Sequence, residues 1–531
     1  MSLSQQPHAK YNGHYAYTAK QVLTNEALVA KKQKLAMYEL MERAGTTAFK
    51  ALKKRWPKTT HVLILAGKGN NGGDGFIVAR LAYLANIQVT VLVTTDVKSI
   101  KGDALIAYQA MLEVGVSQIV THNLAKHISK FSGDVIVDAL FGIGFYGRLT
   151  ESMQQLVTII NEQAASVLSI DIPSGLCATT GLVSEKHAVV ADMTVTFIVY
   201  KQGLLTGQAA NFVGDLILAD IGLGAAFKNF LPSNTVYQLN SPQLKHAGPL
   251  KKRANTAHKG DVGQVLAVGG DKGMSGAIRL ASEAALRCGA ALVSVCCHTK
   301  NQIFVANGRP ELMLAPCEAK QLADSTAMKK ANVLLLGPGL GQTAWSKDLF
   351  DLAMSKFIDY DALKSDTKWL VIDADGLTLL AKTKCYNDRF ILTPHPKEAA
   401  RLLNCDVQSI EADRFNAVQA IAKKYGGICI LKGAGSLISN GEHTVINSTG
   451  NAGMASGGMG DVLAGIVAAL TLQADDYFAA VCLAVYIHGA AGDIIANNHG
   501  QRGMLASDLF APLQKLVNQC PIRGHSRIED Y

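Results

Sequence analysis

The run Gly67-Lys68-Gly69-Asn70-Asn71-Gly72-Gly73-Asp74-Gly75 decides the fold of the first half of this 531-residue chain. It follows an apolar stretch, 61–66, and precedes a helix-like stretch, 76–85. Its first, third and sixth residues match G-x-G-x-x-G in the strand–loop–helix order that a dinucleotide-binding turn requires. Bare backbone N–H groups at the start of a helix stabilise an anion. The run therefore predicts an anion-binding turn at one end of an α/β sheet.

Strand-like and helix-like runs alternate through the rest of the first half. The opening segment to about Trp56 has the helical spacing of apolar residues. The expected strands are 61–66, 88–94, 134–138, 166–170 and 192–199. This alternation predicts a doubly wound, mostly parallel sheet that binds ligands at the carboxyl ends of its strands.

A second glycine-rich run, Gly457-Gly458-Met459-Gly460-Asp461, opens an apolar helix at 462–470. It lies in a second α/β series, with a hairpin expected at 437–447 that turns at Asn440-Gly441. The expected strands of this series are 263–268, 291–296, 333–336, 369–372, 390–392 and 428–431. Two anion sites suggest two activities on one phosphorylated metabolite, or one activity with two phosphorylated ligands.

The composition changes between the two series. The stretch 221–259 is rich in Gly, Pro and polar residues, with a short strand expected at 235–239. We therefore predict two domains, 1–225 and 259–531, joined by a linker at 226–258.

Composition narrows the class of protein. Apolar residues make up 49% of the chain and charged residues 18%, the balance of a globular protein with ample core. The net charge of +9 includes no basic run beyond Lys251-Lys252-Arg253, so we expect no nucleic-acid partner. Ten cysteines without a CxxC pair argue against structural zinc and for a reducing compartment. The most apolar run, 477–496, contains His488 and Asp493, and no signal sequence is evident, so we expect a soluble cytoplasmic protein without a membrane partner.

Acidic residues stand at the ends of predicted strands in the first half. Asp138 and Asp171 each end an apolar run, and the carboxyl ends of parallel strands meet in one crevice. The oxygens of Asn71, Asp138 and Ser174 could hold a hard cation there. The alternatives are acids that only cap helices or turns, a purely structural glycine turn, and a nicotinamide-dependent dehydrogenase in which Asp96 follows the next strand.

Three separated motifs in the first half resemble the NAD(P)H-hydrate epimerase family. They are GNNGGDG at 69–75, VDALFGIG at 137–144 and DIPSGL at 171–176. The resemblance covers roughly 15–225 and implies a Rossmann-like domain that interconverts the R and S hydrates of NADH and NADPH. It implies that Asp171 contacts the nicotinamide end as the acid/base and that Asn71, Asp138 and Ser174 ligate potassium. The implied contacts of the hydrated dinucleotide are Asn70, Asn71, Gly72, Gly73, Asp74, Gly142, Ile143, Gly144, Phe145, Tyr146, Gly147 and Arg148.

The residues alone make this chemistry plausible. The hydrate is a hemiaminal, and a carboxylate that moves a proton at its hydroxyl suffices to open and re-close that centre.

Asp461 stands where the second glycine run passes into a helix. A carboxylate beside such an anion hole can take a proton from a hydroxyl while backbone N–H groups stabilise a transferring phosphoryl group. The alternative is a simple helix cap. The run lacks the Gly-Lys-Ser/Thr of a P-loop, which disfavours a P-loop NTPase.

The second half, about 240–520, resembles the NAD(P)H-hydrate dehydratases of the ribokinase-like superfamily. The supporting runs are 269–277, 336–341, 373–376, 393–398 and 431–436. The resemblance implies a ribokinase-like α/β domain in which a nucleotide phosphorylates the hydroxyl of the S hydrate and phosphate then leaves, with ADP as donor, giving AMP. Asp461 would be the base, and Ala277, Gly339, His395 and Asp461 would contact the hydrate. The implied nucleotide-binding residues are Lys432, Gly433, Ala434, Gly435, Ser436 and Gly460.

Together the two resemblances imply a bifunctional repair enzyme for NADHX and NADPHX. Magnesium is expected with the nucleotide, with Asp373, Asp375 and Glu398 as possible ligands. A homo-oligomer is expected. The alternatives are a small-molecule kinase of the vitamin or sugar type with an accessory Rossmann-like domain, and a non-enzymatic nucleotide-sensing or partner-binding module.

Overall fold

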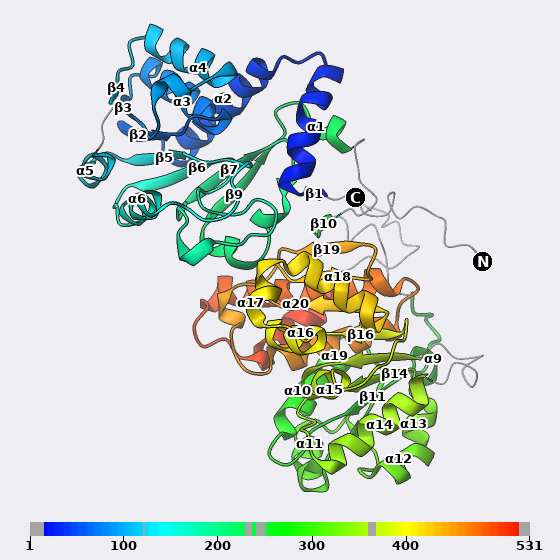
Figure 1. The fold of residues 1–531 in the computed structure, drawn as a ribbon. Coiled ribbons are helices and arrows are strands. Elements are labelled where there is room, and N and C mark those ends of the chain that lie inside the picture. The colour runs from blue at the N-terminus through cyan, green and yellow to red at the C-terminus, as the bar shows by residue number, and fades with distance from the viewer. Residues whose placement is uncertain are drawn as a thin grey trace, which may run out of the picture. The chain divides into compact units, whose positions relative to one another are not determined.

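The computed structural model describes residues 15–119, 123–228, 236–239, 250, 252–358 and 368–519. The chain divides into two compact units, one spanning His14–Val236 and the other containing Tyr237–Tyr531 (Figure 1). Most of the predicted linker, 226–258, lies outside the described residues. The strand expected at 235–239 is present as β10 (Val236–Leu239).

The first unit is built on a sheet in which every pairing is parallel, in the order β4-β3-β2-β5-β6-β7-β9. Its strands are β2 (His61–Ala66), β3 (Gln88–Val93), β4 (Gln118–Ile119), β5 (Val135–Ala139), β6 (Ser166–Ile170), β7 (Met193–Phe197) and β9 (Asp215–Ala219). The chain winds one way from β2 and the other way from β5. The switch point between these two strands opens the crevice in which doubly wound sheets bind ligands.

Helices cover both faces of this sheet (Figure 1). Side chains alternate between the faces of a strand, so Val62 and Ile64 of β2 join the core cluster of α2, α3 and α4, whereas Leu63 and Leu65 join that of α5 and α6. The helices are α1 (Ala19–Lys32), α2 (Met37–Arg55), α3 (Asn70–Leu84), α4 (Gly102–Glu113), α5 (Leu124–Ser129), α6 (Glu151–Asn161) and α7 (Gly224–Phe227). A short strand, β1 (Tyr15–Tyr17), pairs in parallel with β8 (Tyr200–Lys201).

The second unit also contains a mostly parallel sheet. It runs β13-β12-β11-β14-β15-β16-β17 in parallel and continues through the antiparallel strands β18 and β19, which form the predicted hairpin. The strands are β11 (Gln264–Val268), β12 (Leu292–Cys296), β13 (Met313–Leu314), β14 (Val333–Leu336), β15 (Trp369–Ile372), β16 (Phe390–Leu392), β17 (Ile428–Leu431), β18 (Leu437–Ser439) and β19 (Thr444–Asn447).

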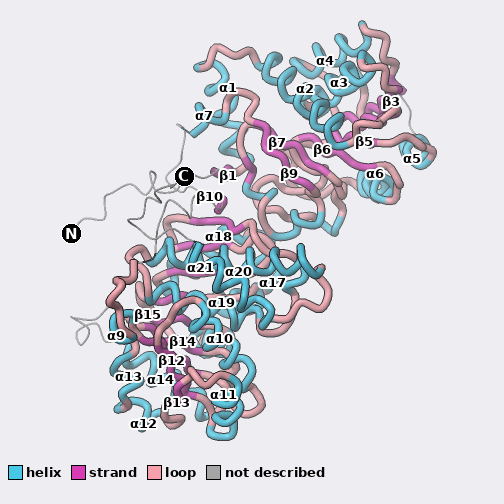
Figure 2. The backbone as a smooth tube through the Cα atoms, turned by 180° about the vertical axis from the view of Figure 1, so that it is seen from behind, coloured by secondary structure: helices cyan, strands magenta, loops and turns pink. Residues whose placement is uncertain are grey.

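Apolar helices form much of the core of the second unit. Helix α19 packs against both α10 and α20 (Figure 2). A Cβ on Gly465 of α19 would lie 2.0 Å from the carbonyl oxygen of Ala281 in α10, so glycine permits this close approach. The helices are α9 (Lys259–Val262), α10 (Ser275–Arg287), α11 (Gln302–Gly308), α12 (Ala319–Asp324), α13 (Thr326–Lys330), α14 (Ala344–Ile358), α15 (Ala374–Leu380), α16 (Pro396–Leu403), α17 (Val407–Ala412), α18 (Arg414–Tyr425), α19 (Met459–Leu472), α20 (Tyr477–His499) and α21 (Phe510–Gln519).

Helix α20 is long and apolar enough to span a membrane by length and composition alone. However, 61% of its most apolar window is buried within the protein. It packs against α19 and α21. We therefore assign it to the core of the second unit.

The fold class predicted from the sequence is confirmed. The first unit is a Rossmann-like doubly wound sheet, and the second is an α/β domain built on a mostly parallel sheet. Every strand expected from the sequence is present with ends within two residues of those expected. One boundary is corrected: α3 begins at Asn70 rather than Phe76, so most of the glycine run is helical.

Candidate active sites

A cavity of about 810 Å³ lies at the switch point of the first sheet. Its wall is formed by the loops that follow β2, β5 and β6, together with side chains of α1, α2 and α4. This is the crevice in which the topology places a ligand. The volume is that of a pocket for a large organic ligand.

Close packing explains the glycines at the start of α3. A Cβ on Gly67 would lie 2.1 Å from the carbonyl oxygen of Leu140, and one on Gly72 would lie 2.0 Å from the carbonyl oxygen of Gly67. A Cβ on Gly73 would lie 2.6 Å from the sulfur of Met41. The backbone of the turn is therefore pressed against the loop after β5 and against α2. This packing holds the first N–H groups of α3 at the cavity, where Asn70 and Asn71 line the wall.

Asp171 is the carboxylate at the end of β6. Its backbone is left-handed, with φ of 62°, a conformation that aspartate tolerates better than most residues. Three donors converge on its Oδ1: Lys201 Nζ at 2.5 Å, Thr196 Oγ1 at 3.0 Å and the Phe197 N–H at 3.4 Å. Among the described residues no donor contacts Oδ2, and Asp171 lines the cavity. The arrangement presents one fixed carboxylate oxygen to a ligand.

Three other acids, Glu26, Asp74 and Asp103, line the same cavity. Burial raises the pKa of Asp74 well above its usual range, and the charges of Asp171 and Glu26 raise it further, while Lys201 opposes them. Burial also raises the pKa of Glu26, which projects from α1. Lys201 and Glu26 were not expected from the sequence, because a single polar residue in a buried strand or on an amphipathic helix carries no motif.

Ser174 contacts Asp138, and both Ser174 and Asn71 contact the carbonyl oxygen of Phe141 in the loop after β5. The Asp138 carboxylate is fully buried and accepts from Ser174 Oγ at 2.6 Å, Ser174 N–H at 2.8 Å and Ser169 Oγ at 2.9 Å. Asn71 Nδ2 donates to the carbonyl oxygen of Phe141 at 2.9 Å, and among the described residues its buried Oδ1 has no partner. Burial raises the pKa of Asp138. An unpartnered amide oxygen beside a buried carboxyl group is a donor set suited to a hard cation.

Not all of the predicted substrate contacts line the cavity. Asn70, Asn71, Asp74, Asp171 and the stretch 142–146 do line it. Gly72 and Gly73 lie behind the wall in helix packing. Gly147 is not part of the wall, and Arg148 Nη2 pairs with Glu185 Oε2 at 2.7 Å.

The second site lies at the N-terminus of α19. Gly458 caps this helix with φ of 89°, and Asp461 is in its first turn. A Cβ on Gly460 would lie 3.2 Å from Lys432 Nζ and 3.9 Å from Asp373 Oδ2. The structure thus brings the start of α19, the end of β15 and the end of β17 together.

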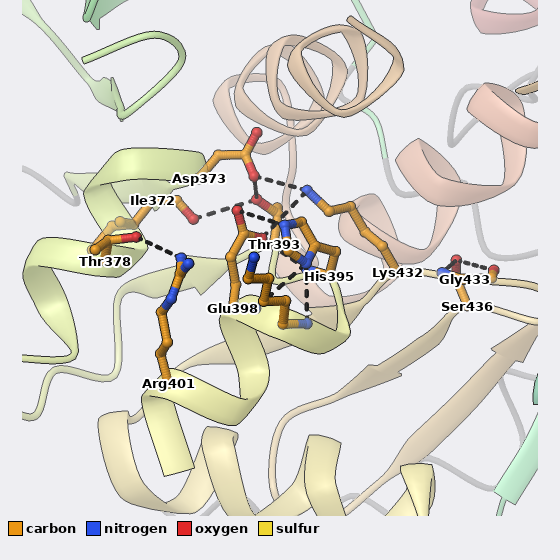
Figure 3. A network of polar contacts seen from close by, with 11 residues as sticks. Ile372, Asp373, Thr378, Thr393, His395, Glu398, Arg401, Lys432, Gly433 and Ser436 are labelled. Atoms are coloured by element: carbon orange, nitrogen blue, oxygen red, sulfur yellow. Dashed lines mark hydrogen bonds and ion pairs between the residues drawn. The ribbon is translucent and has the colours of Figure 1, made fainter. Parts of the chain in front are cut away.

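Lys432 is the centre of the polar network in this site (Figure 3). Its Nζ donates to Asp373 Oδ1 at 3.0 Å and lies 3.9 Å from Glu398 Oε2. Thr393 Oγ1 donates to the same Asp373 oxygen at 2.6 Å. Burial lowers the pKa of Lys432, but Asp373, Glu398 and Asp461 outweigh it, so the net pKa is raised. Lys432 is therefore protonated at neutral pH and places a positive charge next to the N-terminus of α19.

His395 caps α16 and is held by Glu398. The backbone N–H of His395 donates to Glu398 Oε2 at 2.8 Å, and the ring Nδ1 accepts from the backbone N–H of Lys397 at 3.1 Å. Because Nδ1 accepts, the ring proton lies on Nε2, which is 3.3 Å from Glu398 Oε1. Burial, followed by the charge of Lys432, lowers the pKa of His395. A neutral histidine is expected at neutral pH.

Two carboxyl groups in this site titrate near neutrality. Burial raises the pKa of Asp461 to about 7, with a further rise from Asp373 and an opposing effect of Lys432. Burial raises the pKa of Glu398 to about 7 as well, again opposed by Lys432. A carboxylate with a pKa near the working pH is suited to accept a proton during a reaction.

Arg414 anchors the predicted nucleotide loop. Its buried guanidinium donates to the carbonyl oxygens of Lys432 at 3.1 Å and Leu431 at 3.4 Å, and pairs with Glu411 at 3.0 Å. Within the loop, the Gly433 N–H donates to Ser436 Oγ at 3.2 Å, and the same oxygen donates to Gly433 O at 2.9 Å. Arg414 was not expected from the sequence, since a basic residue at a helix start usually faces solvent.

The other predicted hydrate contacts lie together at the start of α10. A Cβ on Gly339, whose φ is 58°, would lie 3.2 Å from the Cβ of Ala277. Asp375, a possible magnesium ligand, accepts from the Gly341 N–H at 2.8 Å. Among the described residues, no group of three or more His, Cys, Asp and Glu side chains is arranged to hold a metal ion.

Comparisons with known proteins agree with this two-site arrangement. The family described as YjeF-related protein N-terminus matches residues 37–203, and the family described as NAD(P)H-hydrate dehydratase matches residues 265–515. The bifunctional NAD(P)H-hydrate repair enzyme Nnr of Escherichia coli K12 is 41% identical, over 95% of this chain and 94% of its own. That of Coxiella burnetii is 40% identical, over 94% of this chain and 99% of its own.

Two solved structures resemble the second half of the chain. An ADP/ATP-dependent NAD(P)H-hydrate dehydratase from Bacillus subtilis is 26% identical and covers 53% of this chain and 97% of its own, with a TM-score of 0.47. A ribokinase-like superfamily protein from Enterococcus faecalis is also 26% identical, covering 53% of this chain and 95% of its own, with a TM-score of 0.48. On the sequence matches over nearly its whole length, this chain belongs to the family of bifunctional NAD(P)H-hydrate repair enzymes.

Proposed function

We propose that this chain carries both activities of its family. The first unit interconverts the R and S hydrates of NADH and NADPH, and the second dehydrates the S hydrate with a nucleotide as phosphoryl donor. The observation that carries the proposal is that a chain matched over 95% of its length by a bifunctional relative has a built polar site in each of its two units. The two activities complement each other, because the epimerase converts the R hydrate into the S hydrate that the dehydratase accepts.

Asp171 is the proposed acid/base of the epimerase. Lys201, Thr196 and Phe197 hold its Oδ1, which leaves Oδ2 to take the proton of the hydrate hydroxyl. The N–H groups at the start of α3 and the residues 70–74 bind the phosphate end of the substrate, as the positive end of a helix favours. The stretch 142–146 covers the other side of the ligand. The exposed Tyr146, at 89% exposure, is free to fold over it.

Potassium is the proposed ion beneath this cavity, with Asn71, Asp138 and Ser174 as ligands. The unpartnered Oδ1 of Asn71 and the buried carboxyl group of Asp138, which has hydrogen bonds but no ion-pair partner among the described residues, support the fit. A monovalent cation neutralises a buried carboxylate that otherwise lacks a counter-charge. The ion would fix the loops after β5 and β6 against each other.

Asp461 is the proposed base of the dehydratase. With a pKa of about 7, it can take the hydroxyl proton of the S hydrate as the oxygen attacks the terminal phosphorus of ADP, which leaves AMP. The N–H groups at the start of α19, with Gly460, and the charge of Lys432 stabilise the transferring group. The phosphate then leaves from the hydrate carbon, the ring nitrogen supplies electrons, and the adjacent carbon loses a proton, which restores the dihydronicotinamide.

The remaining contacts of this site are proposed from the same geometry. Residues 432–436, anchored by Arg414, bind the nucleotide, and Ala277, Gly339 and His395 contact the hydrate. Magnesium would arrive with the nucleotide and neutralise charge on its phosphates. Asp373, Asp375 and Glu398 stay the possible magnesium ligands, and Lys432 pairs with Asp373. The domain boundaries 1–225 and 259–531, the homo-oligomer and the cytoplasmic location stay predictions.

The test is recovery of reduced-nicotinamide absorbance from a mixed R/S NADH-hydrate preparation, with ADP, with ATP and without nucleotide. The proposal predicts complete recovery with ADP and no enzymatic recovery without nucleotide. Recovery with ATP but not with ADP would show that ATP, rather than ADP, is the phosphoryl donor. No recovery with either nucleotide, together with phosphorylation of a simple alcohol, would return the second unit to the small-molecule kinases.

A further inference from the structure

The cavity of the first unit holds more carboxyl groups than one acid/base requires. Asp74 from α3, Glu26 from α1 and Asp171 from the end of β6 all line it, together with Lys201. Asp103 of α4 and Lys68 complete the charged groups in its wall. Among the described residues, Lys201 is the ion-pair partner of Asp171, and neither Asp74 nor Glu26 has one. The two aspartates therefore share a cavity but not a counter-charge.

The Oδ1 of Asp171 is held by a cation and two further donors. Lys201 Nζ contacts its Oδ1 at 2.5 Å, and Thr196 and the Phe197 N–H donate to the same oxygen. Lys201 is itself fixed, because its Nζ also donates to Thr196 Oγ1 at 3.0 Å and to the carbonyl oxygen of Phe197 at 2.9 Å. Its side chain is only 2% exposed. The charge of Lys201 is thus committed to Asp171.

The surroundings of Asp74 favour its neutral form. The residue is 8% exposed, and no cation among the described residues pairs with it. Burial raises its pKa well above the usual range, and the charges of Asp171 and Glu26 act in the same direction, against Lys201. One carboxyl group paired with a lysine and a second, buried carboxyl group without a cation partner in the same cavity are the arrangement expected of a divided acid and base.

The reaction gains from such a pair if the first unit is the proposed epimerase, on which this inference rests, although a carboxylate acting at the hydroxyl alone can open the centre. Opening a hemiaminal ring removes a proton from the hydroxyl and leaves an electron pair on the ring nitrogen. A single carboxylate serves only the first of these atoms. We propose that Asp74 is a second catalytic residue, a neutral carboxyl group that gives its proton to the ring nitrogen while Asp171 accepts the hydroxyl proton.

The step balances without any further reagent. The hydroxyl O–H bond breaks, its proton joins Asp171, and its electrons form the carbonyl double bond. The carbon–nitrogen ring bond breaks, and its electron pair takes the proton of Asp74. The open form is a neutral amino aldehyde. After rotation, the nitrogen adds to the other face of the carbonyl, returns its proton to Asp74, and the oxygen recovers its proton from Asp171.

The test compares the wild-type chain with Asp74→Asn, which keeps the size of the side chain but cannot transfer the proton. The control is Asp388→Asn, the same substitution at an exposed aspartate of the other unit. Epimerase kcat and KM are measured across pH, and Asp74→Glu is included as the conservative variant. Infrared difference spectra at neutral pH report whether Asp74→Asn removes a protonated carboxyl group or an ionised one.

The inference predicts that Asp74→Asn lowers kcat at least about 100-fold with little change in KM, the loss expected for a missing general acid. It also predicts loss of the alkaline limb of the pH profile, partial rescue in Asp74→Glu, and loss of a protonated carboxyl band. An active wild type in which Asp74→Asn keeps more than a third of kcat, or loses an ionised carboxylate band, overturns the inference alone. An inactive wild type overturns the proposed epimerase with it.

Discussion

Replacing Asp461 by asparagine should stabilise the second unit while abolishing dehydration. Burial raises the pKa of Asp461 from 3.8 to about 7 in the folded protein. Each pH unit between these values corresponds to about 1.4 kcal/mol, so ionising Asp461 at neutral pH costs the fold up to about 4 kcal/mol. Asparagine has the same shape and carries no such cost.

The sign of the effect follows from proton binding. Between about pH 4 and pH 7, the folded chain holds the Asp461 proton and the unfolded chain does not, so this group makes stability fall as pH rises. The difference between Asp461→Asn and the wild type should therefore be absent below about pH 4, grow up to about pH 7, and stay constant above it.

Scanning calorimetry at several pH values measures this difference. Relaxation around the charge reduces the full figure, so we expect about 2–4 kcal/mol at pH 8, or a rise in the midpoint of the second unit of at least about 4 °C. The exposed control Asp388→Asn should change stability by no more than about 0.5 kcal/mol. An Asp461→Asn variant that is no more stable than the wild type at pH 8, or that gains as much at pH 4, would refute the reasoning.

Three further predictions concern the two sites. Lys432→Met removes the charge that lowers the Asp461 pKa, so the ascending limb of the pH–rate profile for dehydration should move to higher pH; an unmoved limb contradicts the coupling. Gly67→Ala would place a Cβ 2.1 Å from the Leu140 carbonyl oxygen, so it should lower both the thermal midpoint of the first unit and epimerase kcat/KM, the latter at least about 100-fold, without loss of dehydration. A Cβ on Gly69 would meet no heavy atom within 4 Å, so Gly69→Ala should keep the thermal midpoint. Equal effects of the two alanines would refute the packing argument. Potassium should raise the thermal midpoint of the first unit more than lithium does, and Asp138→Asn should remove that difference; identical midpoints in both salts would contradict the cation site.

Much of the fold was predictable because the strands of a parallel sheet are buried on both faces. Such strands read as continuous apolar runs, and His61–Ala66 and Val333–Leu336 were placed to the residue for that reason. The short strands β4 and β13, each of two residues, carry no comparable run. The start of α3 was misplaced because its glycines signal a loop, whereas in the structure they permit close helix packing.

The location of the candidate sites was predictable in the same way, since ligands bind at the strand ends of doubly wound sheets. What escaped prediction is the charge pairing inside each site. Lys201 reaches Asp171 across 30 positions of sequence, and Lys432 reaches Asp373 across 59. No local pattern records such a pairing, because it depends on which strands the topology makes neighbours.

The central claim is that one chain carries two separate activities, and mixing two variants tests it most directly. Asp171→Asn with ADP should convert only the S fraction of a mixed R/S hydrate preparation, apart from slow spontaneous epimerisation. Asp461→Asn should convert none. An equal mixture of the two variants should recover the full absorbance at a rate close to that of the wild type. A mixture that recovers no more than Asp171→Asn alone would contradict the account.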